Sequence, residues 1–296
     1  MEQSKEPIII FTVSDDHYAV MLGVLLKSVE INHRSLEKII FYIIEDQISS
    51  SNKQNLYESI SDEKIEIVWI KMKHAIPEGL KLPSDNSSYP TSIYMRFFIP
   101  SLLPLHIEKA IYLDADTMVL DDISSLWNTD LKDYPLAAVV DERVKSFDNE
   151  WGGIKNYKDF DFLPHTKYFN TGLLLLNLKV WRDQNISSQL IEVIEKNKKI
   201  AQYPDQYALN VVLANRWIEL DPRWNCFSTN TMKDPLMVHF VSRKPIYKTY
   251  DSNPDYYTYF HNYLNQTRWQ NFQLIGEFPR YFKKIQNILL KKIFRR

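Results

Sequence analysis

Two acidic residues separated by one position, Asp114 and Asp116, directly follow the apolar run 110–113. Such a run predicts a strand, and a strand end would hold both carboxylates on a rigid element. Carboxylate oxygens are hard ligands that suit Mn²⁺ or Mg²⁺, and a cation held here can in turn bind a diphosphate. On these residues alone a second interpretation stays open, in which the pair is ordinary turn chemistry facing water.

For several other residues, a chemical role and an ordinary structural role are both open on the sequence alone. His239 lies in the apolar stretch 236–241, and imidazole is a good ligand for Mn²⁺, although a lone histidine on an apolar strand is usually a core residue. Lys244 can meet a phosphate as a point charge or lie solvated in a loop. Asp205 and Gln206 begin a helix-like stretch, where Asp205 by itself is interpreted as an N-terminal cap.

The elements that must position these side chains alternate between strands and helices. Apolar, β-branched runs predict strands at 8–13, 38–45, 65–70, 110–113, 136–140, 168–178 and 237–241. Helical spacing of apolar residues predicts helices at 17–31, 49–60 and 205–214. This alternation predicts an α/β fold with a mostly parallel mixed sheet flanked by helices. Ligands of such sheets bind at the carboxyl ends of strands, where Asp15 and the Asp114–Asp116 pair fall.

Composition narrows the classes of function. The 296 residues are 45% hydrophobic, enough for one large α/β domain or for a domain with a small appendage. A net charge of -1 argues against a nucleic-acid binder. The single cysteine, Cys226, excludes an internal disulfide and a thiolate metal site. None of the six glycines forms a phosphate-cradling loop, so bound phosphates must be neutralised by a metal ion or by Lys and Arg.

Several longer segments resemble glycosyltransferase family 8. In order they are FTVSDDHYAV, SIYMRFFIP, IYLDADTMVLDDISSLWNTDL, AAVVDE, YFNTGLLLLNLKVWR, YPDQYALNVVL and HFVSRKPIY, and they span residues 8 to about 247. The resemblance implies a GT-A fold and a retaining, metal-dependent transfer of a hexose, glucose or galactose. The implied donor is a UDP-sugar held through Mn²⁺, with Mg²⁺ as the alternative cation. The implied acceptor is a glycan or a lipid-linked glycan.

The same resemblance implies roles for twelve residues. The implied metal ligands are Asp114, Asp116 and His239. The implied substrate-binding residues are Val13, Asp15, Tyr18, Arg96, Asn170 and Lys244. The implied catalytic residues around the donor sugar are Asp141, Asp205 and Gln206.

Two departures from the family pattern concern the nucleotide. His17 stands where relatives carry asparagine. The segment between His239 and Lys244 is one residue shorter than in many relatives and lacks their glycine. These departures fall on the residues that, by the resemblance, contact the nucleoside and the diphosphate.

Two other functions stay open. One is a non-catalytic relative that binds a sugar nucleotide. The other is a haloacid-dehalogenase-like phosphatase, in which an apolar strand also leads into Asp-x-Asp. That class has Thr or Val two places after the second Asp, where this chain has Met118.

The end of the chain differs in composition from the rest. Residues 280–296 carry seven basic and no acidic residues. Apolar residues recur there at helical spacing: Phe282, Ile285, Leu289 and Ile293. We therefore expect a GT-A catalytic domain at 1–250 and a helical appendage at 251–296 that ends in a basic amphipathic tail. The tail is either packed on the domain or laid on an anionic leaflet.

Localisation is predicted from what the sequence lacks. No stretch approaches the length of a membrane span, and the first apolar run is too short for a signal-peptide core. We expect a cytoplasmic protein, with peripheral contact at the inner face of the membrane as the role of the basic tail.

Overall fold

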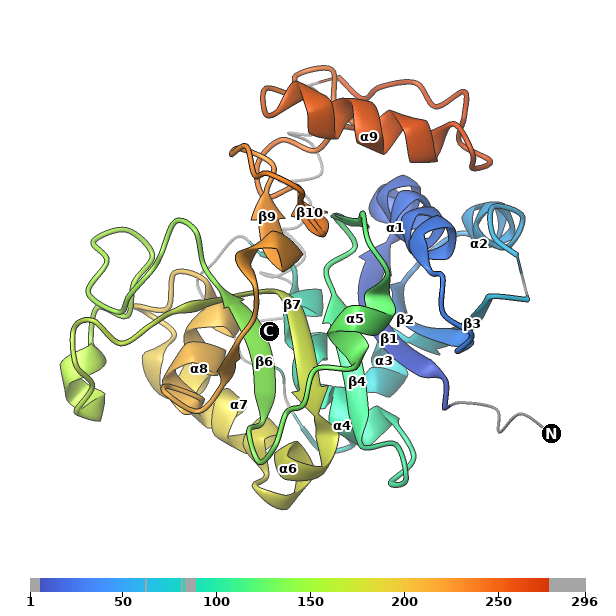
Figure 1. The fold of residues 1–296 in the computed structure, drawn as a ribbon. Helices are drawn as coiled ribbons and strands as arrows, with labels where there is room; N and C mark the ends of the chain where they lie inside the picture. The colour runs from blue at the N-terminus through green and yellow to red at the C-terminus, as the bar shows by residue number, and fades with distance from the viewer. Residues whose placement is uncertain (1–5, 62, 81, 83–88, 277–296) are drawn as a thin grey trace.

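The computed structural model describes residues 6–61, 63–80, 82 and 89–276. The main strands are β1 (Ile8–Asp15), β2 (Ile39–Asp46), β3 (Ile65–Lys71), β4 (Lys109–Leu113), β6 (Leu136–Val140), β7 (Phe169–Asn177) and β8 (Ile218–Glu219). Within the described residues they form one sheet in the order β3-β2-β1-β4-β7-β6-β8 (Figure 1). Strand β7 is antiparallel to both of its neighbours, and the other pairings are parallel. The predicted α/β fold with a mostly parallel mixed sheet is therefore confirmed.

A second, smaller sheet joins distant parts of the chain. Its strands are β5 (Thr117–Val119), β10 (Met237–His239) and β9 (Cys226–Phe227). Strand β10 runs antiparallel to β5 and parallel to β9, with His239 opposite Thr117. This pairing brings His239 next to Asp116, although the two residues are far apart in the sequence.

Helices cover both faces of the main sheet. The α-helices are α1 (Ala19–Asn32), α2 (Ser50–Tyr57), α3 (Met72–Ala75), α4 (Ile99–Leu102), α5 (Ile123–Trp127), α6 (Leu178–Asp183), α7 (Ile186–Asn197), α8 (Pro204–Val212) and α9 (Pro254–Leu264). The 3-10 helices are η1 (Asp16–Tyr18), η2 (Thr91–Phe98), η3 (Tyr157–Phe160) and η4 (Pro222–Asn225).

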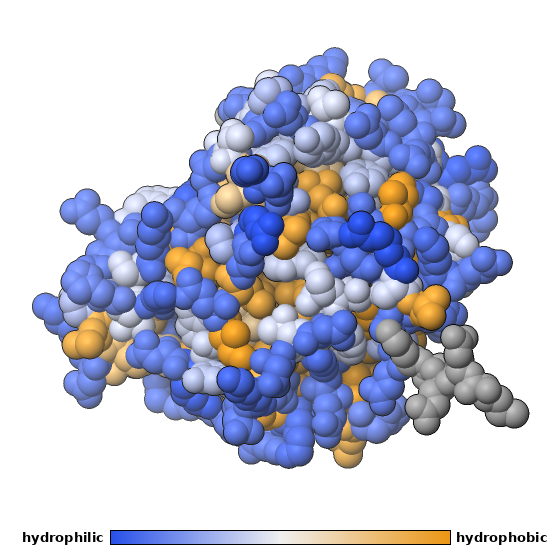
Figure 2. Space-filling view, in the orientation of Figure 1, coloured by the Kyte–Doolittle hydropathy of each residue, from blue (hydrophilic) through white to orange (hydrophobic). Residues whose placement is uncertain are grey.

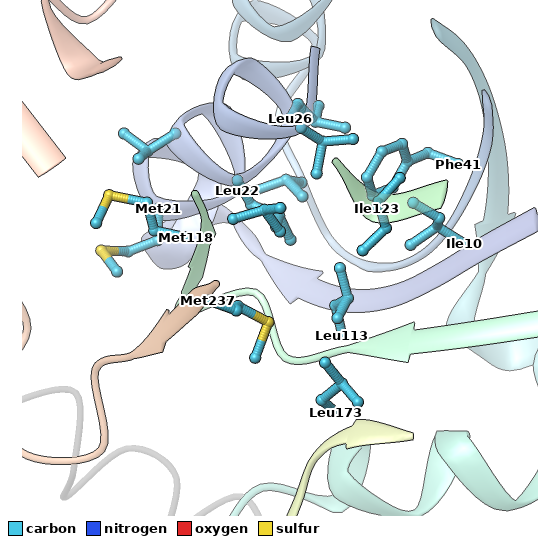
Figure 3. Close-up of a cluster of buried hydrophobic side chains, with 14 of the residues drawn as sticks. Ile10, Met21, Leu22, Leu26, Phe41, Leu113, Met118, Ile123, Leu173 and Met237 are labelled. Atoms are coloured by element: carbon cyan, nitrogen blue, oxygen red, sulfur yellow. The ribbon is translucent and has the colours of Figure 1, made fainter. Parts of the chain in front are cut away.

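Alternate residues of the central strands face two apolar clusters, because side chains point to opposite faces along a strand. One cluster joins Ile10, Phe41 and Leu113 to α1, α5 and α9; Figure 3 shows the contact with Leu22 and Leu26 of α1. The other joins intervening strand residues to η2, α4, α6, α7 and α8. Helix α1 is buried along nearly its whole length, which explains its apolar character on all sides.

The connection between β6 and β7, residues 141–168, has an apolar cluster of its own. Val144, Phe147 and Tyr168 pack there against Tyr207 and Val211 of α8. Because β6 and β7 are antiparallel, this connection leaves and rejoins the sheet at the same edge.

Residues 252–276 pack on the body of the molecule. Helix α9 lies against α1 (Figure 1), and the ring of Trp269 approaches Gly23 so closely that a Cβ there would lie 2.7 Å from it. Ile275 donates its amide to Ile246 at 2.9 Å. The predicted boundary at residue 250 stays a prediction, and the basic tail lies outside the described residues.

Among the described residues, no helix has both the length and the apolar character needed to span a membrane. On the face drawn in Figure 2, apolar residues show as separate small areas among hydrophilic ones.

Candidate active site

A cleft of about 770 Å³ opens at one edge of the main sheet. The carboxyl ends of β1, β4 and β6 meet the start of the antiparallel strand β7 at this edge. All of the residues predicted for the site line the cleft: Val13, Asp15, Tyr18, Arg96, Asp114, Asp116, Asp141, Asn170, Asp205, Gln206, His239 and Lys244. The fold thus brings together side chains that lie far apart in the sequence.

Asp114, Asp116 and His239 form a group suited to a divalent cation. Their candidate ligand atoms all lie within 4.8 Å of one another. His239 Nε2 is 3.7 Å from Asp114 Oδ2 and 3.4 Å from Asp116 Oδ1. His239 is buried, as a core histidine would be, but its ring nitrogen points at two carboxylates.

The remaining carboxylate oxygens of this group are held by other side chains. Asp114 Oδ1 accepts hydrogen bonds from Arg96 Nη2 at 2.9 Å and from the Tyr112 hydroxyl at 2.6 Å. Asp116 Oδ2 lies 2.6 Å from Lys244 Nζ. Each aspartate therefore keeps one oxygen directed toward His239, which is the arrangement that a shared cation requires.

Charge favours the ionised form of Asp116. Burial acts to raise the pKa of this carboxyl, but the Lys244 ammonium and the His239 imidazole outweigh burial and hold the pKa well below its usual range. Lys244, predicted to contact a diphosphate, thus pairs with a predicted metal ligand here. A carboxylate that stays charged is ready to coordinate a cation.

Arg96 ties the metal group to the start of α8. The guanidinium is buried, pairs with Asp114, and lies 3.4 Å from Asp205 Oδ2. Burial acts to lower the pKa of Arg96, but Asp114 and Asp205 raise it overall, so the side chain stays cationic. Burial raises the pKa of Asp205, and Arg96 offsets part of that effect.

The interpretation of Asp205 as a helix cap is wrong. The N-cap of α8 is Tyr203, which makes no side-chain capping hydrogen bond, and Asp205 lies inside the first turn. The carboxylate instead faces Arg96. Sequence alone could not show this, because the partner comes from η2, far away in the chain.

Asp141, Asn170 and Gln206 form a hydrogen-bonded group deeper in the cleft. Asp141 Oδ2 accepts from Asn170 Nδ2 at 2.8 Å and from Gln206 Nε2 at 3.1 Å. Gln206 Oε1 accepts from the amide of Thr171 at 3.2 Å. Both ends of the Gln206 amide are therefore engaged, which fixes its orientation.

Also in the lining of the cleft, Asp15 caps η1 by accepting a hydrogen bond from the Tyr18 amide at 3.0 Å. His17 Nε2 lies 2.7 Å from the hydroxyl of Tyr247. Tyr247 closely follows the shortened segment that carries Lys244. The first departure, His17, therefore contacts a residue three places after the second.

Several lining residues were missed by sequence reasoning. Tyr112 stands two places before Asp114, and the period of two along a strand could have found it. Part of the lining is an aromatic cluster in which Tyr203 lies 5.7 Å from Tyr89 and 5.6 Å from Trp151 between ring centroids. Asn225, which contacts His239, gave no signal in the sequence.

Gly172 permits the close approach of His239 to β7. A Cβ at this position would lie 2.2 Å from His239 Cε1, and the carbonyl of Gly172 is held at 2.9 Å by the amide of Asp114. The ring would therefore have to move. We expect Gly172→Ala to weaken Mn²⁺ binding at least about tenfold, measured by isothermal titration calorimetry. Gly276→Ala is the matched control, because nothing lies within 4 Å of its Cβ. Unchanged affinity in Gly172→Ala would contradict this account.

Comparison with known proteins identifies the class. The family model described as Glycosyl transferase family 8 matches residues 9–270. General stress protein A of Bacillus subtilis strain 168 is 29% identical over 88% of this chain and 94% of its own length. Lipopolysaccharide 1,2-glucosyltransferase of Escherichia coli strain K12 is 26% identical over 73% of this chain and 61% of its own length.

A solved structure agrees with these relatives. The galactosyltransferase LgtC, in complex with donor and acceptor sugar analogs, superimposes with a TM-score of 0.72 at 25% identity over 88% of this chain and 96% of its own. The fold is therefore the predicted GT-A fold. The chain belongs to glycosyltransferase family 8. This membership rules out the phosphatase alternative.

Proposed function

We propose that this glycosyltransferase is a retaining, metal-dependent enzyme that moves a hexose, glucose or galactose, from a UDP-sugar to a glycan or lipid-linked glycan acceptor. The observation that carries the proposal is the convergence of Asp114, Asp116 and His239 in a cleft that Asp15 and Gln206 also line. The relatives support the choice of sugar, because one is a glucosyltransferase and another a galactosyltransferase.

The metal group fits Mn²⁺ better than Mg²⁺, because one ligand is an imidazole nitrogen. When bound, the cation would supply positive charge that stabilises the diphosphate of the leaving UDP. Lys244 adds a second positive charge at the same place. Arg96 and Tyr112 keep Asp114 oriented throughout, since both bond to its other oxygen.

Retention of configuration requires either a covalent intermediate or attack from the face that UDP leaves. An amide is a poor nucleophile, and the Gln206 amide is engaged at both ends. We therefore favour same-face attack through an oxocarbenium-like state. The bond from the anomeric carbon to the phosphate oxygen breaks as the acceptor oxygen bonds to that carbon, and the acceptor proton passes to the phosphate oxygen. Asp141 and Asp205 would position the hydroxyls of the donor sugar.

The acceptor would enter past the aromatic residues of the cleft. Trp151 is 48% exposed and Tyr89 38%, and both rings pack beside Tyr203. Partly exposed rings at the mouth of a sugar-binding cleft offer apolar faces on which a sugar ring can stack. A glycan acceptor is thus better suited to this opening than a small alcohol.

Release of UDP tests the proposed function directly. Purified protein is incubated with a panel of UDP-sugars, with Mn²⁺ and with a chelator, beside a generic phosphatase substrate. We expect UDP release from UDP-glucose or UDP-galactose only when Mn²⁺ is present. Donor binding without any turnover would instead indicate the non-catalytic relative.

The basic tail is part of the same proposal. Residues 280–296 lie outside the described structure, and the support is their composition alone. Each Lys or Arg near an anionic leaflet contributes on the order of 1 kcal/mol. We expect the full chain to co-sediment with anionic vesicles at low salt and to be released at high salt. Truncation after Phe278 should abolish sedimentation and leave donor hydrolysis intact. Equal sedimentation of both proteins would exclude peripheral membrane contact through the tail.

A further inference from the structure

Asn225 lies between the metal group and the donor-sugar group. It ends η4 and is 1% exposed. Its Oδ1 is 3.1 Å from His239 Nδ1, and its Nδ2 donates to Asn170 Oδ1 at 2.8 Å. Asn170 continues the chain of bonds through its own Nδ2 to Asp141 Oδ2 at 2.8 Å. Buried amides therefore form a continuous path from a predicted metal ligand to a predicted catalytic residue.

The direction of the hydrogen bonds on this path follows from one backbone group, the amide of Gly172. The Gly172 amide can only donate, and it lies 2.9 Å from the Asn170 side chain, which identifies that atom as the acceptor Oδ1. Asn225 must therefore present its NH₂ group to Asn170. Its carbonyl oxygen consequently faces His239.

The orientation of Asn225 sets the tautomer of His239. A carbonyl oxygen accepts and does not donate, so Nδ1 of His239 must carry the proton. In the neutral imidazole, Nε2 then has a free lone pair, and this is the atom directed at Asp114 and Asp116. A histidine binds a metal through such a lone pair, and its other ring nitrogen usually donates to a neighbouring group.

We infer that Asn225 is a positioning residue that holds His239 in the Nδ1–H tautomer and couples the metal group to the donor-sugar pocket. The inference rests on the metal site of the proposed function. It adds a residue from η4 whose side chain touches neither the metal ligand atoms of the aspartates nor the reacting sugar in that proposal. A substitution of Asn225 should therefore affect both metal binding and donor-sugar binding.

The backbone around Asn225 is held independently of its side chain. The Asp221 side chain caps η4 through the Arg223 amide, and the Leu236 amide donates to the carbonyl of Arg223 at 2.8 Å. The next residue, Cys226, pairs with Val238 in the small sheet. Substitutions of the Asn225 side chain should therefore leave the fold in place.

Two substitutions separate the two bonds of Asn225. Asn225→Leu removes both, whereas Asn225→Asp keeps an acceptor for His239 and sets a carboxylate oxygen against Asn170 Oδ1. Mn²⁺ affinity is measured by calorimetry without substrate, and KM and kcat for UDP-sugar hydrolysis are measured at saturating Mn²⁺. We expect Asn225→Leu to bind Mn²⁺ about 10- to 100-fold more weakly. We expect Asn225→Asp to bind Mn²⁺ at least as tightly as the unchanged protein and to raise KM for the donor about tenfold.

Asn210→Leu is the matched control. Asn210 is equally buried, but its side chain bonds only to backbone atoms of Phe169 and Gln206. We expect this variant to melt at a lower temperature with unchanged Mn²⁺ affinity. If Asn225→Leu behaves in the same way, Asn225 is only structural and the inference is wrong. If Asn225→Asp loses Mn²⁺ affinity as Asn225→Leu does, the tautomer argument is wrong.

A measurement on the unchanged, metal-free protein needs no variant of Asn225. Nitrogen-15 NMR reports which ring nitrogen of His239 carries the proton, and the signal is assigned by its loss in His239→Gln. A proton on Nδ1 supports the inference, and a ring protonated on Nε2 alone overturns it. Failure of the unchanged protein to bind Mn²⁺ at all would instead overturn the proposed metal site, and the inference with it.

Discussion

We expect Asp116→Asn to lower sugar transfer on the order of 10³-fold and to leave the folded structure intact. Asparagine has nearly the same shape as aspartate, so the packing around β5 and β10 is kept. The carboxylate that faces both Lys244 and His239 loses its charge, and with it most of its affinity for a divalent cation. The measurements are transfer or UDP release at saturating donor, Mn²⁺ affinity by calorimetry, and thermal melting.

Asp121→Asn is the control for this experiment. Asp121 is a nearby acidic residue that pairs with Arg34 on the surface and does not line the cleft. We expect its activity and Mn²⁺ affinity to match those of the unchanged protein. Full activity of Asp116→Asn, or full activity of the unchanged protein in excess chelator, would falsify the metal assignment.

We expect Arg96→Met to destabilise the protein by about 3 kcal/mol or more, because it leaves the carboxylates of Asp114 and Asp205 without their counter-charge. Arg96 contacts Asp114 and Asp205, donates to the carbonyl of Thr171 at 2.7 Å, and lies over the Tyr112 ring. Methionine can fill the space but supplies no charge and no donors. The free energy of unfolding is measured with urea, with and without Mn²⁺. We expect Mn²⁺ to restore part of the loss, since the cation neutralises Asp114.

Arg34→Met tests whether any arginine pair would show the same effect. Arg34 pairs with Asp121, but this pair is solvent-exposed, and exposed pairs contribute between about 0 and 1 kcal/mol. An Arg96→Met variant as stable as Arg34→Met would show that Asp114 and Asp205 do not need the guanidinium as their counter-charge.

The strands that carry the site could be predicted because each is a local apolar run. Strand β6 occupies the predicted residues 136–140, and β1 extends two residues beyond the predicted 8–13, ending at Asp15. The Asp114–Asp116 pair is equally local, since its position after β4 is read directly from the sequence. A local sequence pattern is enough to predict a strand or a pair of site residues when all of the residues involved lie close together in the sequence.

The rest of the site depends on pairings that no local pattern encodes. His239 reaches the aspartates only because β10 pairs with β5. Asp205 was interpreted as a cap because its partner, Arg96, comes from a separate helix, η2. Asn225 has no distinguishing neighbours in the sequence, and its role is visible only from three hydrogen-bonded side chains brought together by folding.

The connection between β6 and β7 is relevant to how the substrate specificity of this fold can change. Asp141 and Asn170 stand at the two ends of this connection and bond to each other, while Trp151 within it lines the mouth of the cleft. In the proposed function, the residues that bind the donor sugar would stand at the two ends of this connection, and the residues that contact the acceptor would lie between them. The sequence of this connection can therefore change while β6 and β7 keep their pairing. Because the connection packs through Val144, Phe147 and Tyr168 onto α8, a grafted replacement must bring matching apolar residues with it.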